Sequence, residues 1–572
     1  MRPGGVLDSG KWDARVDFGL RTDGTPPLFY PLKCGCSSVV EHLLAKEDVA
    51  SSSLVTRSSL RRRRSCESEG WSVMQAISIN PSLDQFRALA EQGNLIPLVA
   101  TFVADVETPV SAFAKIRKQG PCYLFESAEK NEESGRFSFI GADPLVSIQS
   151  RGDKISIFER GQRQDRSMET DPLAELKRAM DRFRFVPHSE LHHFVAGAVG
   201  YVGFDVVRFF EPKVALHSRD DLQLPEFAFM IPGLTIVFDH RLRKMHVICN
   251  ARLDRDDPVD SAYREAKAKL ESLVATLQQP VELPPIPTNK PEKLPVPNSS
   301  TTREEFETMV GQAKELIAAG DIYQVVLSQR FDVDFAGDEL LLYRCLRFGN
   351  PSPYMFCLKL LDDVTFLGSS PELHVKLQNR VAAIRPIAGT HRRGRDLAED
   401  EKLARLLVED PKERAEHVML IDLARNDLGR VAEFGSVKVT EQMAIERYSH
   451  VMHIVSHVVA RLRDGLDAFD AVRATFPAGT LSGAPKIRAM QIIADLEKAR
   501  RGFYGGIAGY FGFDGSHDSC IAIRSMVVKD GKAYLQTGAG IVADSDPARE
   551  YQECVNKANA MLDAIARAKT MA

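Results

Sequence analysis

The stretch TREEFETMVGQAKELIAAGDIYQVVLSQRF, from Thr302 to Phe331, predicts a helix that leads directly into a strand. Its first four residues have the Thr-x-x-Glu pattern of a capping box, which satisfies free amides at a helix N-terminus. Apolar residues then recur at helical spacing as far as Gly320, a residue that commonly ends helices. In the strand that follows, neighbouring side chains face opposite sides, so Gln324 lies on the face opposite Tyr323.

On the N-terminal side of this stretch the pattern is that of a sheet. Apolar and aromatic segments alternate with short polar turns as far as about residue 250, which predicts a large, mainly antiparallel sheet. A helix is expected over about residues 259–277. The proline-rich segment 279–300 is then typical of a linker between an N-terminal region, 74–278, and a C-terminal domain, 301–572.

Residues 1–73 differ from the rest of the chain. They contain serine and arginine runs and few periodic apolar positions, and the piece from Cys36 to Ser58 resembles the conceptual translation of a tRNA gene. We expect either a disordered extension or a misassigned start, with the working protein beginning at Met74.

Composition excludes several classes of protein. The chain has 572 residues and a formal net charge of −4, which argues against a dedicated nucleic-acid binder. No apolar run approaches the ~18–20 residues that span a bilayer. The nine cysteines are scattered and lack metal-ligand spacing, so a cytoplasmic protein without disulfides is expected.

Two pairs of carboxylates have helical spacing. Glu550 and Glu553 share a helix face with Lys557, and Glu413 and Glu416 repeat the i, i+3 spacing elsewhere. Two such faces that meet could hold a hard cation such as Mg²⁺. Taken alone, each pair is equally typical of a solvated helix surface.

The sequence alone leaves the roles of five further residues open. Glu372 follows a predicted strand at a proline turn, where a carboxylate is usually on the surface, and His453 lies in an apolar run that favours a satisfied core histidine. Arg524 is expected in mid-strand and needs an anionic partner there. Gly538 and Gly540 suggest either a plain turn or close approach of the backbone to another group.

Together these segments resemble the chorismate-utilising enzymes. The resemblance covers residues 74–572 and rests on an ordered set of motifs: GDIYQVVLSQRF (320–331), GSSPE (368–372), RPIAGT (385–390), AEHVMLIDLARND (415–427), FPAGTLSGAPKIRAM (476–490) and GAG (538–540). It implies an α/β (α+β) fold, a two-domain sandwich of large, mainly antiparallel sheets with outer helices.

Within this family the chain most resembles the component I branch of the anthranilate synthases. Gln324 stands where the water-using isochorismate and salicylate synthases carry a lysine base, so ammonia is favoured as nucleophile. Ala388 stands where aminodeoxychorismate synthases, the alternative branch, commonly carry a nucleophilic lysine. The segments LFES (124–127) and NPSPYMF (350–356) resemble those that bind feedback tryptophan.

The resemblance implies a magnesium-dependent lyase that converts chorismate and ammonia to anthranilate and pyruvate. Glu372 matches the general acid and His453 the residue of the elimination step. Gln324 is the third catalytic position, where an amide that cannot take a proton from water favours ammonia. The implied Mg²⁺ ligands are Glu416 and Glu553 first, and then Glu413 and Glu550. The implied substrate-binding residues are Gly389, Thr390, Tyr504, Arg524, Gly538, Ala539, Gly540 and Lys557, and the implied tryptophan site is Glu126, Ser127, Pro353, Tyr354 and Met355.

A partner is implied as well. The chain shows no glutaminase nucleophile elbow with a downstream His-x-Glu. Ammonia is therefore expected from a separate glutamine amidotransferase subunit, in a heterotetramer with two copies of each chain. L-Tryptophan is expected as a feedback inhibitor, and neither nucleic acid nor a membrane as a partner.

Overall fold

The computed structural model describes residues 77–128, 135–188, 191, 196–215, 219–254, 257–448 and 451–571. Contacts divide the chain between Val73 and Met74, and the described residues all belong to the second unit. The expectations for residues 1–73 and for a start at Met74 lie outside the described residues.

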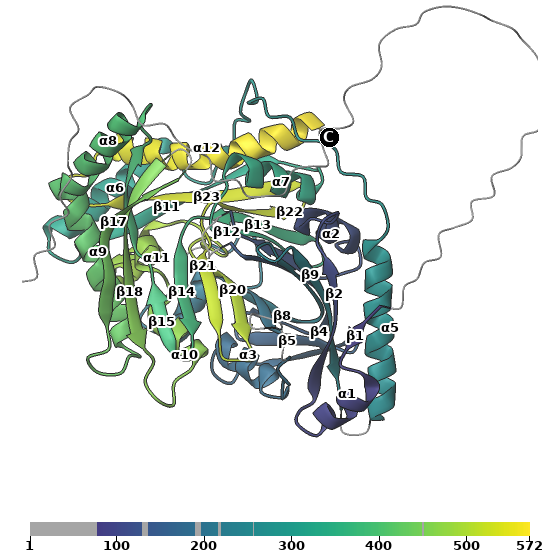
Figure 1. Cartoon of the computed structure of the whole chain (residues 1–572). Coiled ribbons are helices and arrows are strands. Elements are labelled where there is room, and N and C mark those ends of the chain that lie inside the picture. Colours follow the sequence, from purple (N-terminus) through teal and green to yellow (C-terminus); the bar gives the residue numbers. More distant parts are fainter. Residues whose placement is uncertain are drawn as a thin grey trace, which may run out of the picture. The chain divides into compact units, whose positions relative to one another are not determined.

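Helices and strands mix along the whole described chain (Figure 1). The α-helices are α1 (Leu83–Ala90), α2 (Pro109–Ile116), α3 (Pro172–Met180), α4 (Val207–Phe210), α5 (Val259–Leu277), α6 (Arg303–Ala318), α7 (Glu339–Gly349), α8 (Leu397–Glu409), α9 (Pro411–Gly429), α10 (Ala468–Thr475), α11 (Lys486–Leu496) and α12 (Pro547–Met571), with 3-10 turns η1 (Phe204–Val206) and η2 (Gly479–Leu481).

The strands are β1 (Ile79–Asn80), β2 (Leu95–Val103), β3 (Cys122–Glu126), β4 (Phe137–Arg151), β5 (Lys154–Glu159), β6 (Gln162–Ser167), β7 (Gly197–Val202), β8 (Phe227–Asp239), β9 (Lys244–Arg252), β10 (Asn298–Ser299), β11 (Gln324–Asp334), β12 (Tyr354–Leu361), β13 (Val364–Ser370), β14 (Leu373–Gln378), β15 (Val381–Ile384), β16 (Ile387–Arg392), β17 (Lys438–Arg447), β18 (Val451–Arg461), β19 (Gly483–Ala484), β20 (Ile507–Gly512), β21 (His517–Ile521), β22 (Ser525–Lys529) and β23 (Lys532–Ile541).

The mixed fold class with a large antiparallel sheet is confirmed. The 23 strands of the described residues join in one hydrogen-bonded network. The network is continuous because single strands pair on both edges. For example, β22 pairs antiparallel with β13 through Phe366 and Val527, and with β23 through Met526 and Leu535.

Strands from both sides of the proline-rich segment pair with each other. In the first junction β3 lies beside β12, with Leu124 opposite Cys357. In the second, β7 lies beside β20, with Gly200 opposite Gly509. The N-terminal half of the described chain therefore contributes strands that the C-terminal half needs to complete its sheet.

The helix–strand unit that the sequence predicts around Gly320 is present as α6 and β11. Thr302 accepts from the backbone N–H of Glu305, and the Glu305 side chain accepts from the backbone N–H of Thr302, which completes the capping box. Gly320 takes a φ of 81° just after the helix end, a left-handed conformation that glycine adopts without strain. The helix expected over about 259–277 is α5.

The core positions the helices that carry the paired carboxylates. Phe306 of α6, Val325 of β11, Ile541 of β23 and Cys554 of α12 are buried in one apolar cluster. Figure 1 shows α12, in yellow, running across β23 toward α7. Among the described residues, the search for a helix that combines the length and the apolar character of a membrane span returns nothing.

Candidate active site

Glu372 is a buried carboxylate between β13 and β14. Its side chain lies in the interior, with 9% of the residue exposed, and its Oε1 accepts a hydrogen bond of 2.8 Å from the Thr480 hydroxyl. Burial raises the pKa of Glu372 to about 7, against the opposing effects of Thr480, Arg524 and Lys557. Glu372 is therefore not the surface carboxylate that its proline turn favours, and it holds a proton near neutral pH.

Thr480 is a residue whose role the sequence analysis missed. It lies in η2, inside the glycine-rich run 479–486, and its hydroxyl points to Glu372 across the site. The only signal in the sequence was a hydroxyl residue directly after a glycine, a pattern also found in turns without any function.

His453 lies on β18, opposite Thr390 of β16. Its Nδ1 is 2.9 Å from the Gly389 carbonyl oxygen and 3.1 Å from the Thr390 hydroxyl. Burial and the neighbouring Arg524 lower the pKa of His453, so the ring is neutral at pH 7. Because a carbonyl can only accept, Nδ1 carries the proton and Nε2 is left as the basic nitrogen.

The glycines of β23 allow other side chains to approach the backbone. A Cβ at Gly538 would lie 2.9 Å from the Tyr504 hydroxyl, and one at Gly540 would lie 2.8 Å from Nε2 of Gln324. Both glycines pair with β11, so the plain-turn alternative is wrong. Close approach is the physical reason for glycine here, and Lys557 adds a 2.9 Å hydrogen bond from its ammonium to the Gly538 carbonyl.

The carboxylate pairs lie on α9 and α12, as the helical spacing predicts. Burial raises the pKa of Glu413, and the charges of Glu416, Asp410 and Glu553 raise it further. Burial also raises the pKa of Glu550, with Glu553 adding to the effect. The carboxylates of α9 and α12 therefore repel one another, and a bound cation would relieve this repulsion.

Among the described residues, no three histidine, cysteine, aspartate or glutamate side chains lie close enough to hold a metal ion as they stand. Glu553 instead forms a 2.6 Å ion pair with Lys557. The set nevertheless suits Mg²⁺ chemically, because all four donors are hard oxygens and Mg²⁺ commonly keeps several of its waters between itself and protein ligands.

Arg524 lies in a turn and not in mid-strand, which corrects the expectation. It falls between β21 and β22 with a φ of 48°, a left-handed conformation that turns the chain between the two strands. Within the described part of the chain, its guanidinium makes no hydrogen bond and no ion pair. Burial lowers its pKa, while Tyr504, Glu372 and Glu553 raise it. A buried guanidinium without a partner among the described residues is suited to an anionic ligand.

The segments expected to bind tryptophan lie side by side, since Glu126 of β3 pairs with Met355 of β12. The Glu126 carboxylate accepts from the Tyr343 hydroxyl over 2.7 Å and from Arg347 over 3.2 Å. Both donors come from α7, and the sequence analysis did not identify either one. Next to Ser127, the Ala128 N–H donates to the Ser352 carbonyl over 3.0 Å.

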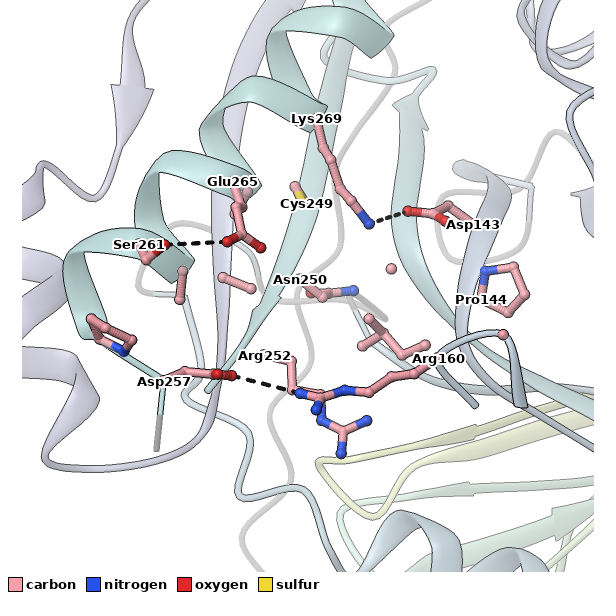
Figure 2. A pocket seen from close by; sticks show the side chains of 17 residues that line it. Asp143, Pro144, Arg160, Cys249, Asn250, Arg252, Asp257, Ser261, Glu265 and Lys269 are labelled. Carbon is pink, nitrogen blue, oxygen red and sulfur yellow. Dashed lines mark hydrogen bonds and ion pairs between the residues drawn. The ribbon is translucent and has the colours of Figure 1, made fainter. Parts of the chain in front are cut away.

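A cavity of about 560 Å³ lies apart from these residues, between α5 and strands β4 and β9 (Figure 2). Two ion pairs join side chains that line it: Lys269 contacts Asp143 at 2.7 Å, and Arg160 contacts Asp257 at 3.6 Å. No candidate site residue lines it.

Comparison with known proteins gives a consistent result. A family described as chorismate binding enzyme matches residues 120–563. Anthranilate synthase component 1 of Acetivibrio thermocellus is 44% identical over 494 residues, which cover 85% of this chain and 99% of that protein. The protein of the same name from Aquifex aeolicus is 45% identical over 496 residues, 86% of this chain and 98% of its own length.

Solved structures agree with this result. The crystal structure of anthranilate synthase component I from Streptococcus pneumoniae TIGR4 has a TM-score of 0.64 at 36% identity, covering 80% of this chain and 98% of that one. A menaquinone-specific isochorismate synthase from Escherichia coli, with a TM-score of 0.62 at 20% identity over 84% of this chain and 98% of its own, shares the fold.

Proposed function

The chain belongs to the anthranilate synthase component 1 family of chorismate-binding enzymes, and on that premise we propose that its site converts chorismate and ammonia to anthranilate and pyruvate. The observation that carries the proposal is that one site holds both a cationic side chain without an anionic partner and a carboxyl group that can donate a proton. Arg524 lacks an anionic partner among the described residues, and Glu372 has a pKa of about 7. A dicarboxylate with a hydroxyl leaving group satisfies both.

Binding precedes the chemistry. The Arg524 fork and the Lys557 ammonium pair with the substrate carboxylates, one as a planar double donor and the other as a point charge. The remaining contacts come from the polar and glycine positions Gly389, Thr390, Tyr504, Gly538, Ala539 and Gly540. These groups hold the ring in one orientation, so that the reacting atoms meet at short range.

Proton transfer falls to two residues. Glu372, protonated near neutral pH, donates to the departing C4 hydroxyl while ammonia adds at C2. The bond to the hydroxyl breaks, and the hydroxyl leaves as water. The ammonium formed at C2 loses one proton to solvent. His453 then takes the C2 proton at Nε2, and the electron pair of that C–H bond completes the aromatic ring while the C3–O bond to the enolpyruvyl group breaks. The released enolpyruvate takes up a proton and becomes pyruvate. Gln324, a neutral amide, cannot deprotonate water, which favours ammonia over water as the nucleophile.

Magnesium is the proposed cofactor. Glu416 and Glu553 would hold it first, with Glu413 and Glu550 acting directly or through water. When bound, Mg²⁺ withdraws charge from the ring carboxylate and so favours attack at C2. The raised pKa values of Glu413 and Glu550 support this assignment, because like charges collected on two helices are stabilised by a cation.

Partner and regulation complete the proposal. A separate glutamine amidotransferase, the component 2 that the relatives' name implies, supplies ammonia in a heterotetramer of two copies of each chain in the cytoplasm. Tryptophan binds at Glu126, Ser127, Pro353, Tyr354 and Met355. We assign regulation to the region 74–278 with this strand pair, and chemistry to 301–572, on either side of the linker 279–300.

The test follows product formation. Purified protein receives chorismate, Mg²⁺ and excess ammonium at mildly alkaline pH, with and without tryptophan. Anthranilate fluorescence that needs Mg²⁺ and falls with tryptophan supports the proposal. Chorismate consumed to aminodeoxychorismate, recognised by mass, would instead support the aminodeoxychorismate synthase alternative, against which Ala388 argues because it offers no nucleophile.

A further inference from the structure

A buried salt bridge lies directly behind the candidate site. Glu497 follows the last residue of α11, and its side chain is 5% exposed, while that of Arg501 is 1% exposed. Arg501 Nε donates to Glu497 Oε2 over 2.9 Å, and its Nη2 donates to Oε1 over 2.6 Å. Such a double contact fixes the plane of the guanidinium as well as its position.

The remaining donors of this guanidinium reach two segments of the site. Nη1 donates to the Leu481 carbonyl over 2.6 Å, and Nη2 donates to the Val326 carbonyl over 2.7 Å. Leu481 directly follows Thr480, the donor to Glu372. Val326 lies two residues beyond Gln324 on β11. The buried Arg501 guanidinium therefore links the turn that carries Thr480 to strand β11, which carries Gln324.

The carboxylate side of the pair reaches the glycine strand. Glu497 Oε1 accepts from the backbone N–H and the hydroxyl of Ser328, over 2.8 and 2.9 Å. Gln536 of β23 donates to the same hydroxyl over 2.8 Å, and Ser328 lies opposite Gly538 in the sheet. The Arg501 guanidinium carbon also lies 5.8 Å from the centre of the Tyr504 ring.

We propose that Arg501 and Glu497 are positioning residues of the chorismate reaction, an inference that rests on the proposed function above. They touch neither substrate nor reacting atoms. They hold Thr480 against Glu372 and keep the β11–β23 pair in register beside Gln324 and Tyr504. A lysine at position 501 keeps the charge but is a point donor, so it cannot serve the carboxylate and both carbonyls in one plane.

The test compares the variants R501K and T480V with their double variant. We expect R501K to lower kcat by at least about tenfold and to change KM for chorismate by less than about threefold, since it misplaces the acid and leaves the ligand contacts intact. The double variant should lose no more than the worse single variant, because both act through one contact. Both single variants should also shift the alkaline limb of kcat upward, since the Thr480 hydrogen bond lowers the pKa of Glu372.

The matched control is R178K on α3, where Arg178 pairs with the buried Glu175 outside the site. It should leave kcat and the pH profile unchanged. If R501K fails to fold, Glu497→Gln, which keeps size and one acceptor oxygen, is assayed in its place with the same expectation. A folded R501K variant with the parent's kcat and alkaline limb would overturn the proposal. Losses of kcat that multiply in the double variant would overturn it as well.

A readout without turnover separates this inference from the proposed function. Amide hydrogen exchange of residues 479–482 should speed up in R501K by about tenfold or more and stay unchanged in R178K, because the turn loses its anchor. If the parent forms no anthranilate, the proposed function fails and the positioning role in that reaction fails with it, while the exchange result still decides whether Arg501 anchors the turn. Exchange in R501K equal to that of the parent contradicts it.

Discussion

The Thr480 hydroxyl donates a 2.8 Å hydrogen bond to Oε1 of Glu372, a residue 108 positions earlier in the chain. This contact brings a glycine-rich turn to the end of a buried strand. It also opposes the effect of burial on the carboxyl, whose pKa nevertheless stays at about 7. The chemistry proposed for the site depends on this balance, because only a protonated Glu372 can assist loss of the substrate hydroxyl.

Glu372→Gln tests the general acid. In the parent protein the pKa of Glu372 is raised above the usual value to about 7. The proton needed for catalysis is therefore present below that pH and is lost as the pH rises through it. We expect kcat to fall by about 10²- to 10⁴-fold, the usual contribution of a positioned acid. The alkaline limb attributable to this group should also disappear from a pH profile of kcat. A variant that keeps the parent's limb would place the acid elsewhere.

Gly540→Ala tests the approach of Gln324 to the glycine strand. The new Cβ would lie 2.8 Å from the Gln324 Nε2, so that side chain must move. A displacement of this size near the reacting atoms costs up to about 10²-fold in kcat. Steady-state kinetics with ammonium measures it. The control Gly311→Ala meets nothing within 4 Å and should leave kcat unchanged while stabilising α6 by about 0.5–1 kcal/mol.

Glu553→Gln tests the cation site. Removing one carboxylate should raise the Mg²⁺ concentration needed for half-maximal activity by about tenfold or more, since Mg²⁺ relies on few direct protein ligands. Titration of activity with Mg²⁺ after chelation provides the measurement. Glu401→Gln, on the exposed face of α8, serves as the matched control, and an equal response of both variants would remove Glu553 from the site.

Ser127→Phe tests the tryptophan segments. Ser127 is half-buried and follows Glu126, which Tyr343 and Arg347 hold in place. A bulky ring there should block tryptophan and leave catalysis largely intact, shifting the inhibition curve by the 5- to 150-fold typical of couplings of about 1–3 kcal/mol. Val296→Phe, at a side chain 86% exposed in the proline-rich segment, should keep the parent's sensitivity. Unchanged inhibition of the Ser127 variant would disprove the assignment.

Lys486→Met tests a buried ion pair beneath the site. Lys486 donates to Asp427 over 2.7 Å, and their side chains are 10% and 6% exposed. Loss of the cation leaves a buried carboxylate alone, which should cost about 3–5 kcal/mol of unfolding free energy at neutral pH. The loss should shrink on acidification, because burial already raises the pKa of Asp427 and the protonated form needs no partner.

Denaturant unfolding at several pH values measures this loss of stability. The comparison is Lys498→Met, whose partner Glu305 is 40% exposed on its side chain. An exposed pair contributes only about 0–1 kcal/mol. Equal losses in the two variants would mean that Asp427 is solvated in the folded protein.

Local patterns predicted several elements because their causes are local. The capping box of Thr302 and Glu305 and the apolar repeat that follows give α6, whose N–H groups are satisfied within a few residues. The paired carboxylates lie on helices for the same reason, since residues three apart share a face of any helix. The order of the family motifs then indicated the fold.

Contacts between distant segments depend on tertiary structure. Glu413 senses Glu553 only because strands far apart in the chain pair and bring α9 toward α12. The turn at Arg524 was missed because its apolar neighbours are typical of a strand, and the single left-handed residue leaves no periodic signal. The role of Thr480 was missed as well, since a hydroxyl in a turn acquires a function only from what it meets.

The amino-acid order therefore specified helices, strands and the kinds of side chain available, through hydrogen bonds and periodic burial that act over a few residues. It did not specify which of these side chains converge. That outcome was decided by the pairing of the 23 strands of the described residues into one network, because burial of apolar surface is shared across the fold and selects one global arrangement. The raised pKa of Glu372 and the lack of an ion-pair partner for Arg524 among the described residues are consequences of that arrangement.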